Sequence, residues 1–327
     1  MNTIKFAPYN DFVTEQHDVE HATVDTFVID GVERRFYNPC NLNVFITNTC
    51  PNSCPFCINK GQTDQVRMSD STYYEDLENA LNRLSGVHLE ATITGGEPTY
   101  LPERLVKTVR MLAAHGVHER TVSTTGYGLL DKYEGKTLFQ HLIENGFTHN
   151  ISISRMSSDD WENDRMLSGN KYSPSRRNIG NDELRRLATI AKANGVQLRT
   201  STNLIRGTAE SHYVRTYRQM LEFVDFQHEL GIDSCLFREL EGNNFKPIML
   251  IPIEPFANMV KCSRNFTHIK TIQGMFYDIW VGLYKSKATG MEYIVKVYKN
   301  HVVDADIIGS LSFNHGVVRK GFHGEEI

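Results

Sequence analysis

Short apolar segments alternate with segments of helical periodicity along most of this sequence, and this alternation constrains the fold more than any other feature. The expected strands are residues 42–47, 88–94, 120–124, 149–154, 197–203 and 233–239. The expected helices are residues 73–84, 102–115, 136–145, 182–194 and 212–230. Strands and helices that alternate at this spacing form parallel βαβ units. About six units are fewer than the eight of a closed TIM barrel, so we expect an α/β fold built as a partial (β/α)6 barrel.

A glycine follows each of these helical segments and precedes a strand. The five are Gly86, Gly116, Gly146, Gly195 and Gly231. Glycine has no Cβ and can take the left-handed conformation that commonly ends a helix. Their repeated position supports the division into βα units.

Three segments are expected along the chain. Residues 41–245 form the barrel, between an N-terminal cap at 1–40 and a β-rich C-terminal extension at 246–327. In the cap, Asp30-Gly31 is a turn signal between two apolar runs and predicts a small hairpin. The strands expected in the two flanking segments are 27–29 and 35–37 in the cap, and 276–281 and 293–298 in the extension.

The composition is that of an ordinary globular protein. Hydrophobic residues make up 40% and charged residues 23%, and no run approaches the roughly 18 apolar residues of a membrane span. The N-terminus lacks the apolar run of a secretory signal, so we expect a soluble, cytoplasmic protein. A formal charge of -4 without a long basic run argues against nucleic acid as a partner.

Three of the six cysteines, Cys50, Cys54 and Cys57, lie within eight positions as C-x-x-x-C-x-x-C, directly after the first barrel strand. This distribution is unlike a disulfide framework. Pro and Asn in the loop let the backbone curl three thiolates around one metal centre. A [4Fe-4S] cluster held by three thiolates keeps one iron open for a substrate or cofactor. The alternative, a closed zinc site, needs a fourth Cys or His, and none lies at a zinc-ribbon spacing.

The cysteine triplet, with the aromatic Phe56 just before its last member, resembles the signature of the radical S-adenosylmethionine (SAM) superfamily. This resemblance implies a partial barrel of the radical SAM type. It also implies that the three cysteines ligate three irons of a [4Fe-4S] cluster, while the amino and carboxylate groups of SAM chelate the fourth.

The second barrel strand ends in Gly95-Gly96-Glu97-Pro98. Consecutive glycines permit close approach of the backbone to a ligand, and α/β folds bind ligands at the carboxyl ends of their strands. Taken alone, the segment is more typical of a simple tight turn. It matches the G-G-E-P element of the superfamily, which implies that it binds the SAM amino group.

Polar residues at the ends of the fourth and fifth barrel strands correspond to further SAM contacts in the family. They are Ser152, Ser154 and Arg155, followed by Thr202 and Asn203. Ser152 and Ser154 share one face because side chains alternate along a strand. The alternative for each is a polar strand end that bonds water or loop backbone.

Two features bear on the subgroup. Arg206-Gly207, after Asn203, resembles a stretch of the molybdenum-cofactor GTP cyclase subgroup. Cys235 and Cys262 lack the C-x-x-C clustering of an auxiliary cluster, so a single cluster is expected, and each is typical of a small buried hydrophobic residue.

Two further segments are candidates for substrate binding. The loop 157–181 is long and polar, as many lids and binding loops are, and the alternative is a disordered segment. The last barrel strand ends in a charged run, 236–241, which either binds substrate at the barrel mouth or forms an internal ion pair.

The resemblance implies that a reduced cluster passes an electron to SAM. The resulting 5'-deoxyadenosyl radical then abstracts hydrogen from a small-molecule or short-peptide substrate. It further implies oxygen sensitivity and a reductant such as flavodoxin or ferredoxin. Three alternatives remain: a glycyl-radical-enzyme activase, a non-radical iron-sulfur or zinc protein, and ordinary methyl transfer.

Overall fold

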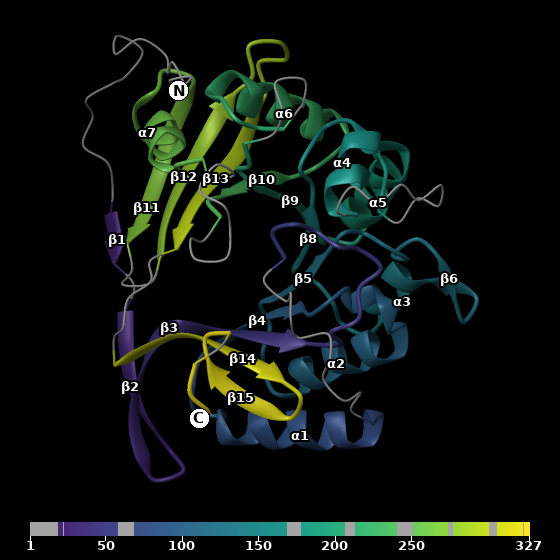
Figure 1. Cartoon of the computed structure of the whole chain (residues 1–327), viewed down its shortest axis with the longest axis vertical. Coiled ribbons are helices and arrows are strands. Elements are labelled where there is room, and N and C mark those ends of the chain that lie inside the picture. The colour runs from purple at the N-terminus through teal and green to yellow at the C-terminus, as the bar shows by residue number, and fades with distance from the viewer. Residues whose placement is uncertain are drawn as a thin grey trace.

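The computed structural model describes residues 19–21, 23–57, 69–168, 178–206, 213–240, 251–273, 277–300, 306–322 and 324–327. Within them, thirteen strands form one curved sheet in the order β1-β11-β12-β13-β10-β9-β8-β5-β4-β3-β14-β15, and β2 pairs with β3 (Figure 1). A separate pair, β6 (Lys132–Tyr133) and β7 (Lys136–Thr137), makes a small hairpin.

Six neighbouring parallel strands form the centre of the sheet. They are β3 (Val32–Phe45), β4 (Leu89–Thr94), β5 (Arg120–Thr124), β8 (Asn150–Ser154), β9 (Gln197–Asn203) and β10 (Ser234–Arg238). Each overlaps one of the six strands expected from the sequence. The expected α/β partial barrel is therefore confirmed.

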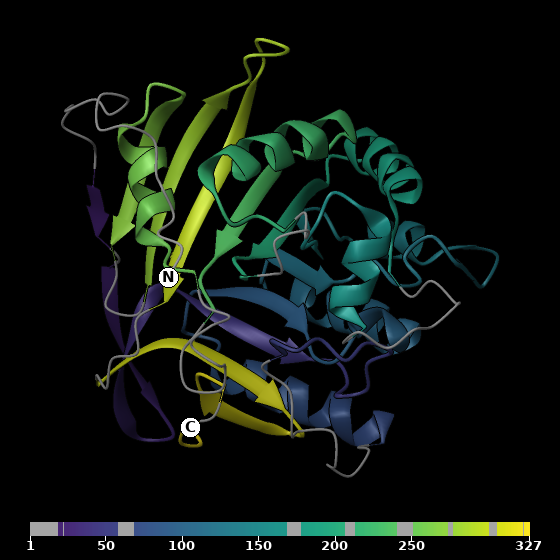
Figure 2. The same ribbon diagram turned by 45° about the horizontal axis from the view of Figure 1, so that its top comes forward.

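The five helices expected from the sequence are also present, on the convex side of the sheet (Figures 1 and 2). They are α1 (Asp70–Arg83), α2 (Pro102–Ala114), α3 (Leu138–Glu144), α5 (Asn181–Ala193) and α6 (Tyr217–Glu229). Three further helical segments were not expected: α4 (Asp160–Leu167), α7 (Glu254–Cys262) and the short 3-10 helix η2 (Pro98–Tyr100). None of the described helices is long and apolar enough to cross a membrane.

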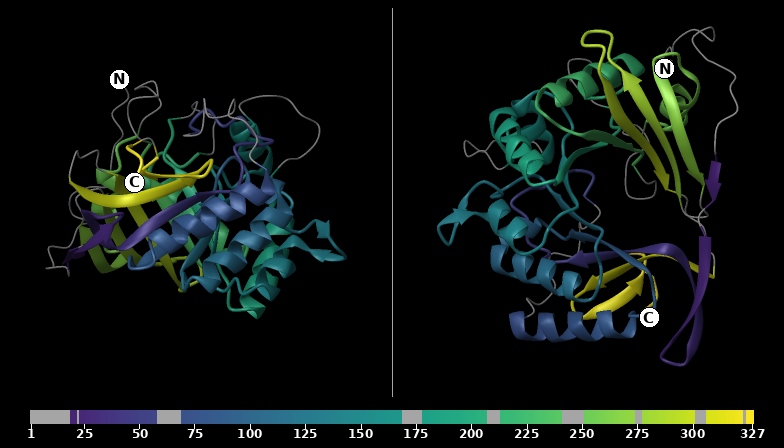
Figure 3. Two further views of the ribbon diagram at one scale, coloured as in Figure 1. Left: turned by 90° about the horizontal axis from the view of Figure 1, so that it is seen from below. Right: turned by 180° about the vertical axis from the view of Figure 1, so that it is seen from behind.

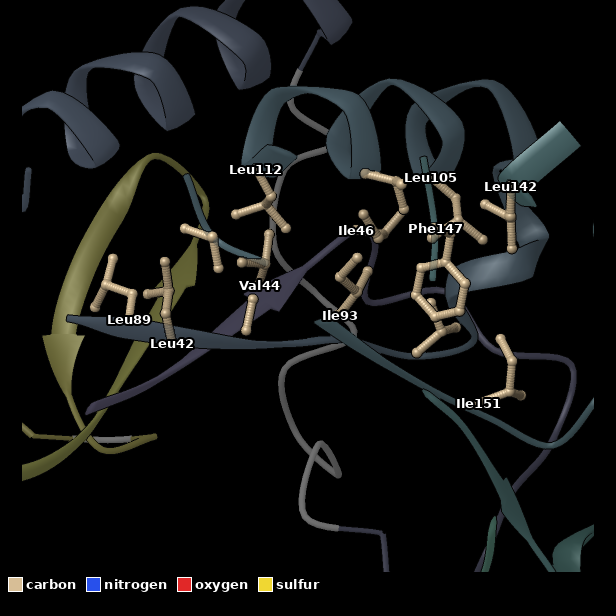
Figure 4. Close-up of a cluster of buried hydrophobic side chains, with 14 of the residues drawn as sticks. Leu42, Val44, Ile46, Leu89, Ile93, Leu105, Leu112, Leu142, Phe147 and Ile151 are labelled. Carbon is tan, nitrogen blue, oxygen red and sulfur yellow. The ribbon is translucent and has the colours of Figure 1, made fainter. Parts of the chain in front are cut away.

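The main hydrophobic core lies between these helices and the sheet (Figure 4). Alternate strand residues such as Leu42, Val44 and Ile93 point to the helices, and Leu105 and Leu112 of α2 meet them from the other side. All five are fully buried. Burial of an aliphatic side chain contributes about 1.5–3 kcal/mol, so this layer fixes the strand register and leaves the other strand face free to bind ligands.

Strands from the C-terminal part extend both edges of the central sheet. On one edge, β13 (Glu292–Asn300) pairs in parallel with β10 and is followed by β12 (Tyr277–Lys285) and β11 (Phe266–Gln273). On the other, β14 (Ile307–Asn314) pairs in parallel with β3 and carries β15 (Val317–Lys320). The two views of Figure 3 show these strands continuing the curve of the sheet. The β-rich C-terminal part is thus present, but it shares a sheet with the barrel.

The N-terminal part also joins this sheet. Strand β2 (Thr23–Ile29) forms the expected hairpin with β3 around Asp30 (φ 51°) and Gly31 (φ 79°), and β1 (Val19–His21) pairs in parallel with β11. Because β3 begins at Val32, the boundary expected at residue 40 lies inside a strand.

Five glycines were expected between a helix and the next strand, and four of them have positive φ: Gly116, Gly146, Gly195 and Gly231. The prediction is wrong for Gly86, which is not among the residues with positive φ. There the chain leaves α1 through a turn closed by the Val87 amide, which donates to the Leu84 carbonyl oxygen at 2.9 Å.

Candidate functional site

The loop after β3 carries Cys50, Cys54 and Cys57 and is anchored to the end of α4. The Ser53 amide donates to the Leu167 carbonyl oxygen at 3.1 Å, and Cys54 Sγ lies 3.2 Å from the same oxygen. Within the loop, the Cys57 amide donates to the Cys54 carbonyl oxygen at 3.2 Å, which closes a tight turn. The turn keeps the last two cysteines near each other, and the Cys57 sulfur influences the Cys54 thiol electrostatically.

The three sulfur atoms act on one another electrostatically. The pKa of the Cys50 thiol is raised to about 12, mainly by burial and with smaller contributions from Glu97 and Cys57, against a hydrogen bond from the Asn52 amide that lowers it. Burial, followed by Cys57 and Cys50, also raises the pKa of Cys54. Clustered thiols of this kind become thiolates when they bind a cation, because a metal supplies the missing positive charge.

The donor set fits a multi-iron cluster. In the described part of the chain, no three His, Cys, Asp or Glu side chains are gathered closely enough to hold one metal ion. A tetrahedral zinc ion needs its sulfur ligands close together, each about 2.3 Å from the metal. An iron-sulfur cube instead binds its thiolates at separate corners. Three cysteine thiols on one short loop are the donor chemistry that a [4Fe-4S] cluster uses.

Gly95 and Gly96, at the end of β4, press directly on the backbone of the cysteine loop. The Gly96 amide donates to the Thr47 carbonyl oxygen at 2.5 Å, and the Glu97 amide donates to the Thr49 carbonyl oxygen at 2.9 Å. A Cβ at Gly95 (φ 132°) would lie 2.3 Å from the Thr47 oxygen, and a Cβ at Gly96 would lie 2.1 Å from the Thr49 oxygen. Only glycine fits at either position. The pair therefore allows the backbone of the cysteine loop to pack directly against the end of β4.

Glu97 is 1% exposed, and its carboxylate links the segment that follows β4 to the segment at the end of β5. Its Oε1 accepts hydrogen bonds from Thr99 N (3.3 Å), Thr99 Oγ1 (2.7 Å) and Thr124 Oγ1 (2.5 Å). Its Oε2 accepts from Thr125 N and Thr125 Oγ1, both at 2.9 Å. With five donors around it, Glu97 positions these two loops. Pro98, also buried, begins η2.

Asn52 is a site residue that sequence reasoning missed. Its Nδ2 donates to Asn178 Oδ1 at 2.7 Å and lies 3.4 Å from Thr125 Oγ1, so it links the cysteine loop to the segment before α5. Its Oδ1 is buried and has no hydrogen-bond partner among the residues that the structure describes. No motif marked this asparagine, although its place between Cys50 and Cys54 was a signal.

Phe56 packs inward beneath the cysteine loop. It is 8% exposed and belongs to a small apolar cluster with Met156, Leu167, Ile205 and Tyr213. Its ring therefore supports the loop from below.

Ser152, Ser154 and Asn203 share the concave face of the sheet, with Ser152 paired to Arg199 deeper along the strands than Asn203. Ser152 Oγ accepts a hydrogen bond from Arg199 Nε at 3.4 Å, and Ser154 and Asn203 are partly exposed at the carboxyl ends of β8 and β9. Thr202 points to the opposite face, is fully buried, and leaves its Oγ1 without a hydrogen-bond partner within the described residues. The first three therefore share the strand face that the helices leave uncovered, and Thr202 does not; their contact with SAM stays a prediction.

Arg155 has a structural role. It is fully buried, and its guanidinium donates to Ile179 O (3.1 Å), Asn181 Oδ1 (2.7 Å) and Asp160 Oδ1 (3.0 Å). These bonds tie the end of β8 to α4 and α5. This is the bonding to surrounding loops that the sequence left open as an alternative.

The segment 157–181 is not one long loop, because its first part contains α4. Parts of three predicted features lie outside the described residues. They are 169–177 of the expected lid, Gly207 of the Arg206-Gly207 pair, and Glu241 at the end of the charged run. The expected lid therefore stays a prediction.

A family model described as the Radical SAM superfamily matches residues 44–220, a stretch that contains the cysteine loop and the central strands through β9. No curated protein sequence matches the chain significantly.

Three solved structures illustrate the likeness. Streptococcus suis SuiB bound to S-adenosylmethionine shares 16% identity over 73% of this chain and 51% of that chain, with a TM-score of 0.48. The protein anSMEcpe with bound AdoMet shares 18% identity over 68% and 56%, with a TM-score of 0.42. The radical S-adenosylmethionine methyltransferase TsrM from Kitasatospora setae shares 11% identity over 70% and 39%, with a TM-score of 0.42. The chain thus spans between 39% and 56% of their lengths.

Proposed function

This chain belongs to the Radical SAM superfamily, and from that premise we propose that it reductively cleaves S-adenosylmethionine and abstracts hydrogen from a small-molecule or short-peptide substrate. We propose a [4Fe-4S] cluster and SAM as its cofactors, with flavodoxin or ferredoxin as the physiological reductant. When bound, these cofactors supply the electron transfer and the radical chemistry. The protein contributes binding, orientation and exclusion of water.

The observation that carries this proposal is the arrangement around the cysteine loop. The loop provides three thiols, from Cys50, Cys54 and Cys57. Its backbone packs against Gly95 and Gly96 so closely that no other residue type would fit there. Cluster ligands and cofactor contacts therefore meet at the carboxyl ends of the strands, where α/β folds bind ligands.

We assign distinct roles to the remaining site residues. Ser154 and Asn203 are partly exposed at this edge and provide hydrogen-bonding groups for SAM, with Ser152 one step deeper on the same face. Glu97 is a positioning residue, because both oxygens of its carboxylate accept hydrogen bonds from Thr99, Thr124 and Thr125. The glycine backbone before it faces the loop and leaves no room for a side chain.

The test is anaerobic reconstitution with iron and sulfide, followed by dithionite and SAM. We expect about four iron ions per chain and release of 5'-deoxyadenosine. Changing Cys50, Cys54 or Cys57 to Ala should abolish both. The matched control is Cys262→Ala, a partly exposed cysteine at the end of α7. S-Adenosylhomocysteine as the product, or a zinc centre in the purified protein, would contradict the proposal.

A further inference from the structure

Three adjacent strands place basic side chains on the concave face of the sheet. Arg199 lies on β9, Arg238 on β10 and Lys296 on β13, and each is partly exposed. Their backbone positions form a diagonal: Arg199 pairs with Ser234, and Lys296 pairs with Leu236, two residues before Arg238.

The neighbours of these residues in sequence confirm the direction of the side chains. Thr200, Phe237 and Val297 are fully buried, and the last two belong to the core that packs under α6 and α7. Because side chains alternate along a strand, Arg199, Arg238 and Lys296 point to the face that the helices do not cover. We call these three residues the basic wall.

The basic wall has few partners within the protein. Arg199 Nε donates to Ser152 Oγ at 3.4 Å, and the Arg238 guanidinium lies 5.0 Å from the centre of the Tyr298 ring. Arg238 Nε is buried and finds no hydrogen-bond partner in the described part of the chain. Within the described residues, no carboxylate forms an ion pair with any of the three.

The charges of the wall act on one another. Burial, together with Arg238, lowers the pKa of Arg199 to about 10. Burial, followed by Arg199 and Lys270, lowers the pKa of Lys296, and Glu90 opposes this effect. Glu90 is itself a weak counter-charge, because burial and a hydrogen bond with Glu119 raise its pKa to about 7. The positive charge on this face is therefore incompletely compensated.

We propose that the basic wall binds a carboxylate or phosphate group of the substrate, so that the enzyme acts on an acidic small molecule. Buried cations are costly unless they are paired, and guanidinium groups bind carboxylate and phosphate through two parallel hydrogen bonds. The term substrate rests on the proposed function, whereas the anion site rests on the wall alone.

The wall runs inward from the strand ends: Arg238 pairs with Asn203 at the carboxyl end of β9, whereas Arg199 lies deeper, beside Ser152. Arg199 precedes Asn203, the last residue of β9, by four positions. At about 3.3 Å per residue, this places Arg199 roughly 13 Å along the strand from its carboxyl end. An anion at Arg199 therefore lies apart from a carboxylate bound next to the cysteine loop.

The test is a calorimetric titration of the reconstituted enzyme with inorganic phosphate and with succinate at low salt. We expect at least one probe to bind, with an affinity that falls as salt rises. The probe that binds identifies the class of anion. Arg199→Gln, Arg238→Gln and Lys296→Gln should each weaken binding about tenfold or more. The matched control is Arg218→Gln on α6, whose side chain is 87% exposed.

Two further measurements separate loss of anion binding from loss of folding, and the anion site from the SAM site. Arg199→Lys and Arg238→Lys retain the charge, so they should retain much of the binding if a Gln variant folds poorly; circular dichroism checks folding. The titration is repeated with saturating SAM. Unchanged anion binding supports a separate site, and competition would show that the wall holds the SAM carboxylate.

The inference and the proposed function fail in different ways. If wild-type protein releases 5'-deoxyadenosine but binds neither probe, or binds them equally well in all three Gln variants, the anion site is overturned and the radical activity stands. If it binds an anion through the wall but cleaves no SAM, the proposed function is overturned instead.

Discussion

His315 and Asn48 are 267 positions apart in the sequence, yet His315 Nε2 lies 2.6 Å from Asn48 Nδ2. His315 (φ 51°) begins the turn between β14 and β15, and Asn48 precedes the first cluster cysteine, Cys50, by two residues. Burial, followed by the charge of Arg104, lowers the pKa of His315 and so favours its neutral form. The C-terminal hairpin thus holds the cysteine loop from the edge of the sheet.

Removing this contact should loosen the cysteine loop. We expect His315→Ala to lose iron several-fold faster to a chelator after reconstitution, and to lower the free energy of unfolding by about 1 kcal/mol, the usual net value of one hydrogen bond. The control is His118→Ala, which removes an exposed histidine between α2 and β5. Equal rates of iron loss in both variants and the wild type would show that the hairpin does not restrain the loop.

The central part of the fold could be predicted because its signals are local. Apolar periodicity located the six central strands and five helices, and Asp30-Gly31 located the hairpin between β2 and β3. The positions of β13 and β14 could not be predicted, since each pairs with a strand distant in sequence. Helix α4 was missed because its sequence, Asp160–Leu167, is mostly polar and has no apolar stripe.

The functional site, like the fold, could be predicted from the sequence only where its signals are local. The cysteine loop and Gly95-Gly96 could be found as motifs because their chemistry depends on short spacings. The environment of Glu97 could not, because its donors Thr124 and Thr125 come from the next βα unit. Arg155 likewise resembled a ligand contact until its three protein partners were known.

The glycine pair offers a sharp test of the close contact between β4 and the cysteine loop. Gly96→Ala introduces a methyl group 2.1 Å from a backbone oxygen, so the loop must move. We expect loss of stable cluster incorporation, measured as iron per chain, and a lower unfolding temperature. Gly86→Ala is the control, because its Cβ would lie 3.6 Å from Phe27 Cδ1, an ordinary contact, and its φ is not positive. A Gly96→Ala protein that binds iron normally would rule out this role.

Glu97 should matter for stability more than any exposed carboxylate. Glu97→Gln removes the charge and directs an amide N–H₂ group toward hydroxyl and amide donors, so several bonds are lost at once. Hydrogen bonds to a charged group contribute about 1.5–3 kcal/mol each, and we expect a loss of at least about 3 kcal/mol in urea unfolding. Glu75→Gln on the exposed side of α1 should change stability by less than about 0.5 kcal/mol. Similar losses in the two variants would contradict the buried network.

The pair of Glu90 and Glu119 should make stability depend on pH in an unusual direction. Burial, followed by the hydrogen bond with Glu119 and its charge, raises the Glu90 pKa from 4.5 to about 7, while Lys296 lowers it. The folded state therefore binds this proton more tightly than the unfolded state. Its stabilising effect is complete below about pH 4.5 and is lost as the pH rises through about 7.

Glu90→Gln keeps a neutral side chain at every pH and should remove this dependence. We expect the free energy of unfolding of wild-type protein to fall relative to the variant between about pH 5 and pH 8, because only the wild type must lose the shared proton. Urea unfolding at the two pH values measures the difference, and the comparison cancels groups common to both proteins, such as His149. A difference that stays constant, or that grows in favour of the wild type at the higher pH, would show that Glu90 is already ionised in the folded state.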